Sequence, residues 1–179
     1  MVIDYCKNEP RIKYHRHEQN IGMIKNAEYS MRRFQGDYLV HLNDDDWLDL
    51  DYVEHSVKFL EQNPDYAFVS PQTRLYSRED SSAEPRLMYA PKLDDEKVIS
   101  RLKKYVASQD TGMISSGCFR ASIIRDCLMA DNFTYKNRYN EDIVFLMKFL
   151  AKGKAKILTI THYNFISFLR LCIKFFKIL

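Results

Sequence analysis

Apolar residues recur every three or four positions in several segments of the chain, which is the spacing of one face of an α-helix. The pattern predicts helices over residues 23–34, 51–62, 94–106, 123–129 and 140–152. The second of these begins with Asp51 and Glu54, which have the spacing of a capping box. Gly153 follows the last helix and is expected to end it.

Short apolar runs bounded by turn residues predict strands. They cover residues 11–15, 38–42, 66–70 and 155–161, whereas residues 76–86 are polar and are expected to form a loop. Predicted strands and helices alternate through the first half of the chain. This order is typical of an α/β domain with a mostly parallel sheet flanked by helices.

Length, charge and cysteine content limit the classes of protein to which the chain can belong. The chain has 179 residues and a formal net charge of +3, which suits one folded domain and does not indicate a nucleic-acid partner. It has no uncharged apolar stretch of 18 residues, and its first residues lack the basic start and apolar run of a signal peptide. The four cysteines, Cys6, Cys118, Cys127 and Cys172, are widely spaced and are expected to be reduced. We therefore expect a cytoplasmic protein.

An acidic run at residues 43–46, with the sequence Asn-Asp-Asp-Asp, directly follows the predicted strand at 38–42. Adjacent carboxylates disfavour one another's ionised form unless a positive charge lies between them. Mg²⁺ or Mn²⁺ provides that charge, takes oxygen ligands and bridges to phosphate. A solvated acidic loop is the alternative for such a run. The apolar residues on both sides, including Trp47 and Leu48 after it, favour a metal and diphosphate site at the end of a strand.

Together with the residues before it, this run resembles the family 2 glycosyltransferases of the GT-A fold. The family's loop reads roughly N-x-G-x-x-x-A/K-N, and residues 18–26 contain Asn20, Gly22, Lys25 and Asn26 in that order. The family's strand reads G-E/D-Y-hydrophobic and runs into an acidic motif followed by Trp-Leu, as residues 36–48 do here. The resemblance implies a Rossmann-like α/β fold.

A second part of the resemblance lies further along the chain. Residues 115–120 resemble the segment that lines the acceptor side in the family. Residues 139–142 resemble its Glu-Asp motif, which implies Asp142 as the general base and Glu141 as the substitute candidate. The alternative is that these two acids only favour the positive end of their helix, which is worth about 0.3–1 kcal/mol each.

The resemblance also implies a set of ligand contacts. Residues expected to bind the donor are Asn20, Gly22, Lys25, Asn26, Asn43, Asp44 and Asp45. Residues expected to hold Mn²⁺ or Mg²⁺ are Asp44, Asp46 and His162. Lys25 is equally well explained as an exposed helix residue. His162 is a weak signal on its own.

The ends of the chain depart from the family. Members begin with a strand, a helix and a second strand, which hold the nucleotide base and have no counterpart here. We therefore expect residues 1–164 to form a GT-A domain that is truncated at its N-terminus. Residues 165–179 have basic residues at helical spacing among apolar ones, which predicts an amphipathic helix for peripheral membrane contact. A helix packed on the core, or a tail altered by truncation, is the alternative.

Three functions remain open from the sequence. The first is inverting transfer of a sugar from a nucleotide-diphosphate donor, expected to be a UDP-sugar, to a hydroxyl of a glycan or a lipid-linked acceptor, with the cation assisting the leaving diphosphate. The second is a catalytically inactive remnant of such an enzyme, or a non-catalytic binding fragment. The third is another metal-dependent enzyme such as a phosphohydrolase, for which the chain shows no second acidic cluster at a strand end.

Overall fold

The computed structural model describes residues 8–43, 46–77, 82–108, 116–130 and 141–167. The chain divides into two compact units, residues 1–34 and residues 35–179. The apolar residues that are buried in the described part, from Tyr52 to Tyr163, all belong to the second unit.

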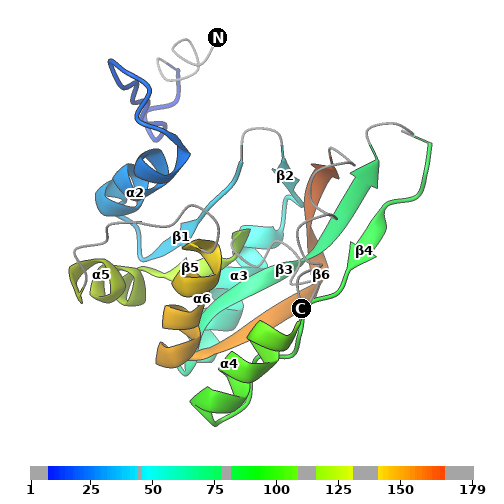
Figure 1. Ribbon diagram of the computed structural model, residues 1–179. Helices are drawn as coiled ribbons and strands as arrows, with labels where there is room; N and C mark the ends of the chain where they lie inside the picture. Colours follow the sequence, from blue (N-terminus) through cyan, green and yellow to red (C-terminus); the bar gives the residue numbers. More distant parts are fainter. Residues whose placement is uncertain (1–7, 44–45, 78–81, 109–115, 131–140, 168–179) are drawn as a thin grey trace, which may run out of the picture. The chain divides into compact units, whose positions relative to one another are not determined.

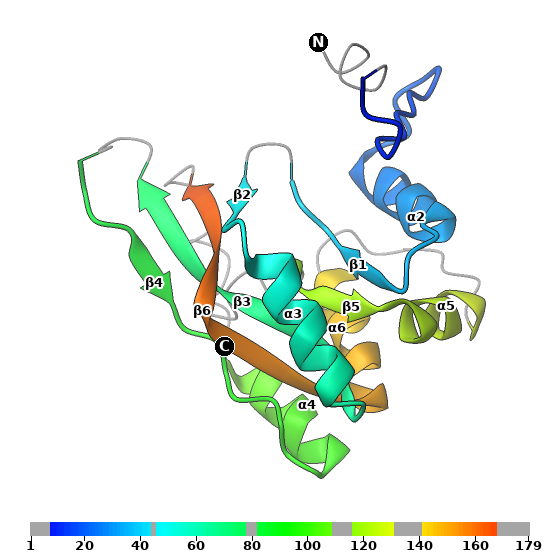
Figure 2. The same ribbon diagram turned by 180° about the vertical axis from the view of Figure 1, so that it is seen from behind.

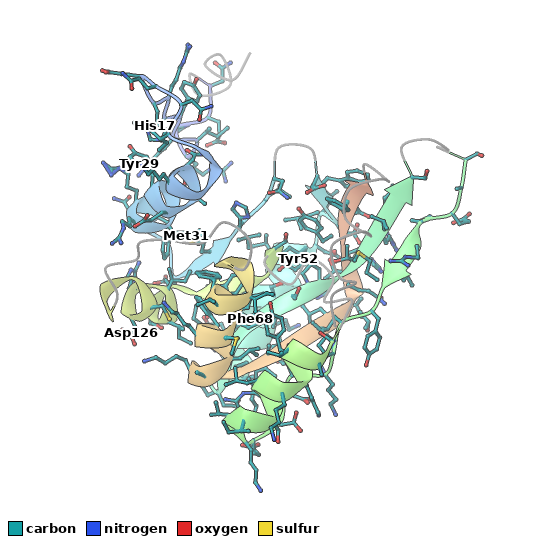
Figure 3. All side chains as sticks on the ribbon, in the orientation of Figure 1. His17, Tyr29, Met31, Tyr52, Phe68 and Asp126 are labelled. Atoms are coloured by element: carbon teal, nitrogen blue, oxygen red, sulfur yellow. The ribbon has the colours of Figure 1, made fainter. Side chains whose placement is uncertain are left out.

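The first unit contains helix α2 (Met23–Arg33). Before this helix, His15 and His17 pack against Tyr29, with ring centroids 4.4 and 4.6 Å from the tyrosine ring; His17 and Tyr29 are labelled in Figure 3. The predicted helix at 23–34 is confirmed. The predicted strand at 11–15 is wrong, because Arg11 lies in a turn and the residues after it pair with no strand.

The second unit is built on a six-stranded sheet (Figure 1). The strands lie in the order β1 (Tyr38–Val40), β5 (Cys118–Arg120), β3 (Tyr66–Ser77), β6 (Lys154–Ser167) and β2 (Trp47–Leu48), with β4 (Arg86–Met88) beside β3. The α/β class is confirmed. The expectation of a mostly parallel sheet needs correction, because among the described pairs only β3 and β6 are parallel and the other four are antiparallel.

The directions of the strands follow from these pairings. Strand β5 runs opposite to both β1 and β3, so β1 and β3 run the same way. Strand β6 is parallel to β3 and therefore shares that direction. The carboxyl ends of β1, β3 and β6 thus lie at one end of the sheet, which is where open α/β sheets bind their ligands.

Helices cover both faces of the sheet. Helix α3 (Tyr52–Gln62) lies on one face, which Figure 2 shows in front. Helices α4 (Val98–Ala107) and α6 (Glu141–Lys152) lie on the other, and α5 (Ala121–Ala130) follows β5. Helix α3 begins after Asp51 as predicted, but no capping box forms. The Asp51 carboxylate instead accepts a hydrogen bond from Thr161 Oγ1 at 3.1 Å.

Two apolar layers hold these helices on the sheet. On the α3 side, Tyr52 and Leu60 pack with Val69 and Cys118. On the α6 side the layer is aromatic and consists of Phe68, Phe119, Phe145 and Phe149. Tyr52 and Phe68 mark the two layers in Figure 3. Cys118 and Cys127 are buried and form no disulfide bond, while Cys6 and Cys172 lie outside the described residues.

Helix α6 and strand β6 are joined by a single residue. A Cβ atom at Gly153 would lie 2.8 Å from the Ala67 backbone nitrogen and 3.0 Å from the Asp65 carbonyl oxygen, so only glycine fits. The predicted end of the helix at Gly153 is confirmed, and the close approach of β3 explains the residue there.

Three short strands were not predicted: β2, β4 and β5. Strand β6 is also longer than predicted and continues to Ser167, pairing with the end of β3. Residues 165–167 are therefore part of the sheet and not the start of a helix, while residues 168–179 lie outside the described part. Among the described residues no helix is long and apolar enough to cross a membrane.

Candidate active site

The acidic run lies on the segment between β1 and β2. These two strands occupy opposite ends of the strand order, with β5, β3 and β6 between them. The segment leaves the carboxyl end of β1 with residues 41–43, and Asp46 directly precedes β2. The run is therefore at the end of the sheet to which β1, β3 and β6 point. Asp44 and Asp45 themselves lie outside the described residues.

Asp46 is held in place by two side chains. Its Oδ2 atom accepts hydrogen bonds from Asn43 Nδ2 at 2.9 Å and from the Tyr163 hydroxyl. Asn43 Nδ2 also lies 3.1 Å from the Tyr163 oxygen, which closes a three-residue network. Asn43 and Asp46 are thereby fixed to β6, because Tyr163 is fully buried in that strand.

The two ionisable groups of this network lie in an unusual environment. Burial, and then the hydrogen bond to the Asp46 carboxylate, raise the pKa of Tyr163, so the phenol stays protonated and donates. Asp46 is only 9 % exposed, and its second oxygen, Oδ1, is buried without a hydrogen bond to any described residue. An ionised oxygen of this kind is costly unless a positive group lies near it.

A second polar cluster surrounds Asp49, just after β2. Its Oδ2 atom is 2.9 Å from His162 Nδ1 and accepts the His162 backbone N–H at 3.0 Å. Its Oδ1 atom accepts from Asn164 Nδ2 at 3.1 Å, and Arg74 lies 3.9 Å away. Burial raises the pKa of Asp49, but the bonds from Asn164 and His162 outweigh it and the net pKa is lowered.

His162 and Tyr163 point to opposite faces of β6, because successive side chains of a strand alternate. His162 is bound to Asp49 and Tyr163 to Asp46, so the structure does not bring His162 and Asp46 together. Within the described residues no group of three histidines, cysteines or acids is arranged to hold a metal ion.

The predicted Glu-Asp motif opens helix α6. Glu141 and Asp142 are the first two residues of this helix, and their side chains are outside what the structure describes. Because α6 ends where β6 begins, its first turn lies toward the carboxyl end of β6 (Figure 1). The start of α6 and the acidic run are thus at the same end of the sheet.

The predicted donor loop belongs to the first unit. Asn20 Oδ1 accepts the backbone N–H of Gly22 at 2.8 Å, and Gly22 has a φ of 82°, which favours glycine. The Asn26 Oδ1 atom lies 3.2 Å from His17 Nε2. Lys25 is exposed on α2. The loop residues are therefore locally ordered around the start of the helix.

Comparison with known proteins identifies the family. The model of the family described as Glycosyl transferase family 2 matches residues 1–125, which is more than two thirds of the chain. The chain belongs to glycosyltransferase family 2. No curated protein matches it.

The fold of this glycosyltransferase is also that of a solved structure. Residues 1–349 of TarS from S. aureus, a GT-A glycosyltransferase, superpose with a TM-score of 0.63 at 14 % sequence identity. The similarity covers 91 % of this chain and 46 % of that one, so the chain spans about half the length of the TarS structure. At this identity the likeness establishes the GT-A fold.

Sequence reasoning missed several residues of the site. Tyr163, Asn164 and Asp49 were not predicted, although they hold the segments on either side of β2. The partners are 115 to 117 residues apart, and no local pattern connects them. The one available signal was the polar pair His162 and Asn164 at alternate positions of a strand that is otherwise largely apolar.

Proposed function

We propose that this glycosyltransferase moves a sugar from a nucleoside-diphosphate donor, a UDP-sugar, to an acceptor hydroxyl with inversion at the anomeric carbon. The observation that supports the proposal is that two acidic segments lie toward the same end of the sheet, the end at which β1, β3 and β6 finish. The run after β1 and the first turn of α6 approach that end from different parts of the sequence.

The acidic run has the donor set of a hard divalent cation. The buried Oδ1 of Asp46 has no hydrogen-bond partner among the described residues, and the sequence adds two more carboxylates directly before it, Asp44 and Asp45, whose positions lie outside the described residues. Mn²⁺ or Mg²⁺ bound there would neutralise the charge of the leaving diphosphate. We leave His162 out of this site because Asp49 engages it on the other face of β6.

We assign the remaining catalytic and binding roles to residues of the chain. Asp142 accepts the proton of the acceptor hydroxyl, whose oxygen attacks the anomeric carbon from the side opposite the diphosphate. Tyr163 and Asn43 keep the Asp46 carboxylate oriented, so that this side chain is already positioned when the donor binds. Asn20, Lys25 and Asn26 are proposed to bind the donor because of the family's loop motif.

Thermal unfolding in the presence of ligand tests the donor half of the proposal. We expect UDP or a UDP-sugar at about one hundred times its dissociation constant to stabilise the protein by about 2.7 kcal/mol. For a chain of this size that is a rise in melting temperature of about 5–10 °C. The rise should require Mn²⁺ or Mg²⁺, and Asp45→Asn should reduce it, while Asp126→Asn on the exposed side of α5 serves as the control.

Turnover tests the catalytic half. Asp142→Asn should keep the metal-dependent rise in melting temperature and lose sugar transfer, since it removes the base and leaves the donor site intact. Full transfer by this variant would show that another group is the base. No metal-dependent rise with any common nucleotide sugar would favour the inactive remnant.

A further inference from the structure

Two aromatic rings form a small platform at the carboxyl end of β3 and β6. The rings of Trp47 and Tyr76 have centroids 5.1 Å apart and an interplanar angle of 41°. Trp47 lies on β2 and Tyr76 on β3, the two neighbours of β6, so the rings meet across that strand. Trp47 is 42 % exposed, which is unusual for so large an apolar side chain.

Polar side chains lie on the same face as this platform. Trp47 and Arg74 both pair with Asn164 in the sheet, and paired residues of neighbouring strands project to the same side. Asp49 and His162 join them through the hydrogen bonds described above. Phe68 of β3 packs against Phe149 of α6 and so points to the face that α6 covers. Ser70 and Gln72 lie two and four residues further along β3 and point to the same face.

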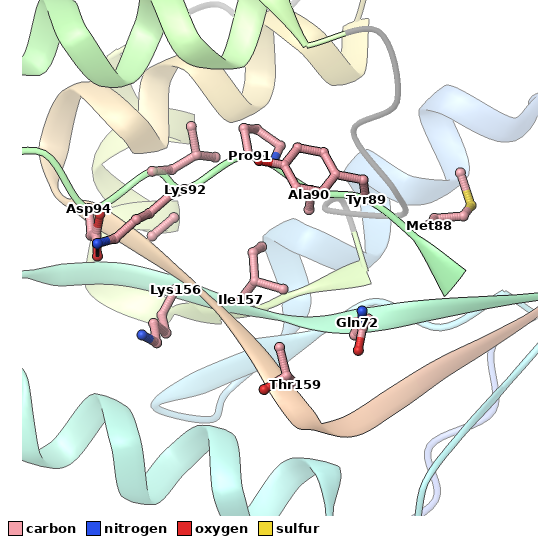
Figure 4. A pocket seen from close by; sticks show the side chains of 12 residues that line it. Gln72, Met88, Tyr89, Ala90, Pro91, Lys92, Asp94, Lys156, Ile157 and Thr159 are labelled. Atoms are coloured by element: carbon pink, nitrogen blue, oxygen red, sulfur yellow. Dashed lines mark ion pairs between the residues drawn. The ribbon is translucent and has the colours of Figure 1, made fainter. Parts of the chain in front are cut away.

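A pocket continues this face toward α4. It has a volume of about 310 Å³ and lies between β6, the middle of β3 and the segment that follows β4. Figure 4 shows Tyr89 and Pro91 above the strands, with Gln72 and Thr159 on the strands below. Tyr89 is 71 % exposed and gives the pocket an aromatic wall of its own.

The platform and the pocket are joined along β3. Gln72 lines the pocket and Tyr76 belongs to the platform, four residues further on. Four residues of a strand span about 13 Å. A single hexose ring does not cover that distance, whereas a short oligosaccharide does.

Most of the charges along this path are paired, and Lys156 of the pocket lining is the exception among the described residues. Arg74 lies 3.9 Å from Asp49, and in the pocket Lys92 lies 3.6 Å from Asp94. A path with paired charges, hydrogen-bonding side chains and aromatic rings suits a ligand with many hydroxyls and no net charge. The faces of aromatic rings carry partial negative charge and pack against the C–H groups of a sugar ring.

We propose that the acceptor is an oligosaccharide of at least two linked sugars, with one ring on the Trp47–Tyr76 platform and another in the Tyr89 pocket. This inference rests on the proposed function, because it names the substrate of the acceptor side of the same site. It requires no contact with the nucleotide donor.

Glycan binding without donor tests the inference. The full chain is applied to an array of mono- to hexasaccharides of common hexoses and N-acetylhexosamines, and the bound glycans are titrated in solution. Trp47 is the only tryptophan of the chain, so its fluorescence reports directly on the platform. We expect tri- or tetrasaccharides to bind at least about tenfold more tightly than their monosaccharide and to change the emission of Trp47.

Two variants locate the binding. Trp47→Ala and Tyr89→Ala should each weaken oligosaccharide binding by about tenfold or more. Tyr14→Ala, an equally exposed aromatic of the first unit, is the matched control and should bind normally. Tyr89 is so exposed that its replacement leaves the fold intact, which keeps the test valid if the Trp47 variant misfolds.

The inference is overturned if no glycan of the array binds, if monosaccharides bind as tightly as longer chains, or if the Tyr89 variant binds like the wild type. The donor titration separates this failure from failure of the proposed function. Donor binding without glycan binding removes only the oligosaccharide acceptor. Glycan binding without donor binding leaves the carbohydrate site and removes the transferase activity.

Discussion

The hydroxyl of Tyr163 and the carboxylate of Asp46 meet across 117 residues of sequence, and their contact fixes the acidic run to β6. A buried carboxylate keeps its orientation only while its hydrogen-bond donors remain. Asn43 is the second described donor to Asp46, so the loss of either donor should disturb the orientation of the Asp46 carboxylate.

Replacing Tyr163 by phenylalanine tests this network. Tyr163→Phe removes one donor and leaves Asp46 with Asn43 alone, which should lower the free energy of unfolding by about 1–3 kcal/mol. Urea unfolding followed by circular dichroism measures it. Tyr89→Phe removes an exposed hydroxyl and is the control. Equal stability of the two variants would show that the Tyr163 contact contributes nothing.

Asp49 is expected to make the stability of the fold depend on pH. Hydrogen bonds from Asn164 and His162 lower its pKa below the ordinary value of 3.8 despite its burial. A carboxyl whose pKa is lower in the folded state stabilises the fold above its unfolded pKa, and this stabilisation is lost as the pH falls through the folded value. The wild type should therefore be more stable than Asp49→Asn near neutral pH, with a difference that shrinks below a pH of 3.8.

Unfolding midpoints of the two proteins between pH 3 and pH 7 would measure this difference. Asp126→Asn, which changes an exposed carboxyl on α5, should show no such trend. A difference between wild type and Asp49→Asn that stays constant with pH would mean that the ionised form of Asp49 is not what the cluster stabilises.

At the scale of elements, the tight connection between α6 and β6 makes a sharp prediction. Gly153→Ala places a methyl group against the backbone of Ala67 and Asp65, and the strand has to shift to admit it. We expect a loss of about 1–3 kcal/mol in unfolding free energy. Val144→Ala, at an exposed position of the same helix, should cost much less. Equal losses would contradict the close packing at Gly153.

Most helices were predictable from the sequence because their apolar residues repeat over three turns. Helices α2 and α3 match the predicted ranges to within about one residue, and α6 does so at its described end. Strands β2 and β5 were not predictable, since two or three residues carry no readable alternation. The direction of β5 was equally hidden, because pairing with β1 and β3 decides it and neither is adjacent in sequence.

The candidate site was predictable only in its local parts. The run at residues 43–46 stood out because apolar residues flank it and because it resembles a family motif. Its partners could not be found in this way, since the contact of Asp46 with Tyr163 exists only in the folded chain. The pair formed by the exposed Trp47 and the half-buried Tyr76 was hidden for the same reason, because the two rings come together through the pairing of three strands.

At the scale of the whole molecule, the division into two units predicts separable roles. The buried apolar residues of the described part all lie in residues 35–179. A protein of residues 35–179 alone should therefore unfold cooperatively, with a stability within about 1 kcal/mol of the full chain. Under the proposed function it should also lose most of the rise in melting temperature with donor, because the loop at residues 20–26 is gone.

Calorimetry of the full chain and of residues 35–179, with and without UDP and Mn²⁺, would check both expectations. An unfolded shorter protein would show that the first unit is needed for the core. A shorter protein that binds donor as well as the full chain would remove residues 20–26 from the proposed donor site.

The one-residue joint at Gly153 has a mechanical consequence. Because one residue joins α6 to β6, we expect the helix and the strand to move together. The proposed base then lies at the start of α6, and the proposed acceptor face lies along β6. Motions that admit a donor or release a product must then hinge elsewhere in the chain. Evolution or engineering can exchange the segment after β4 for a new acceptor without displacing the base.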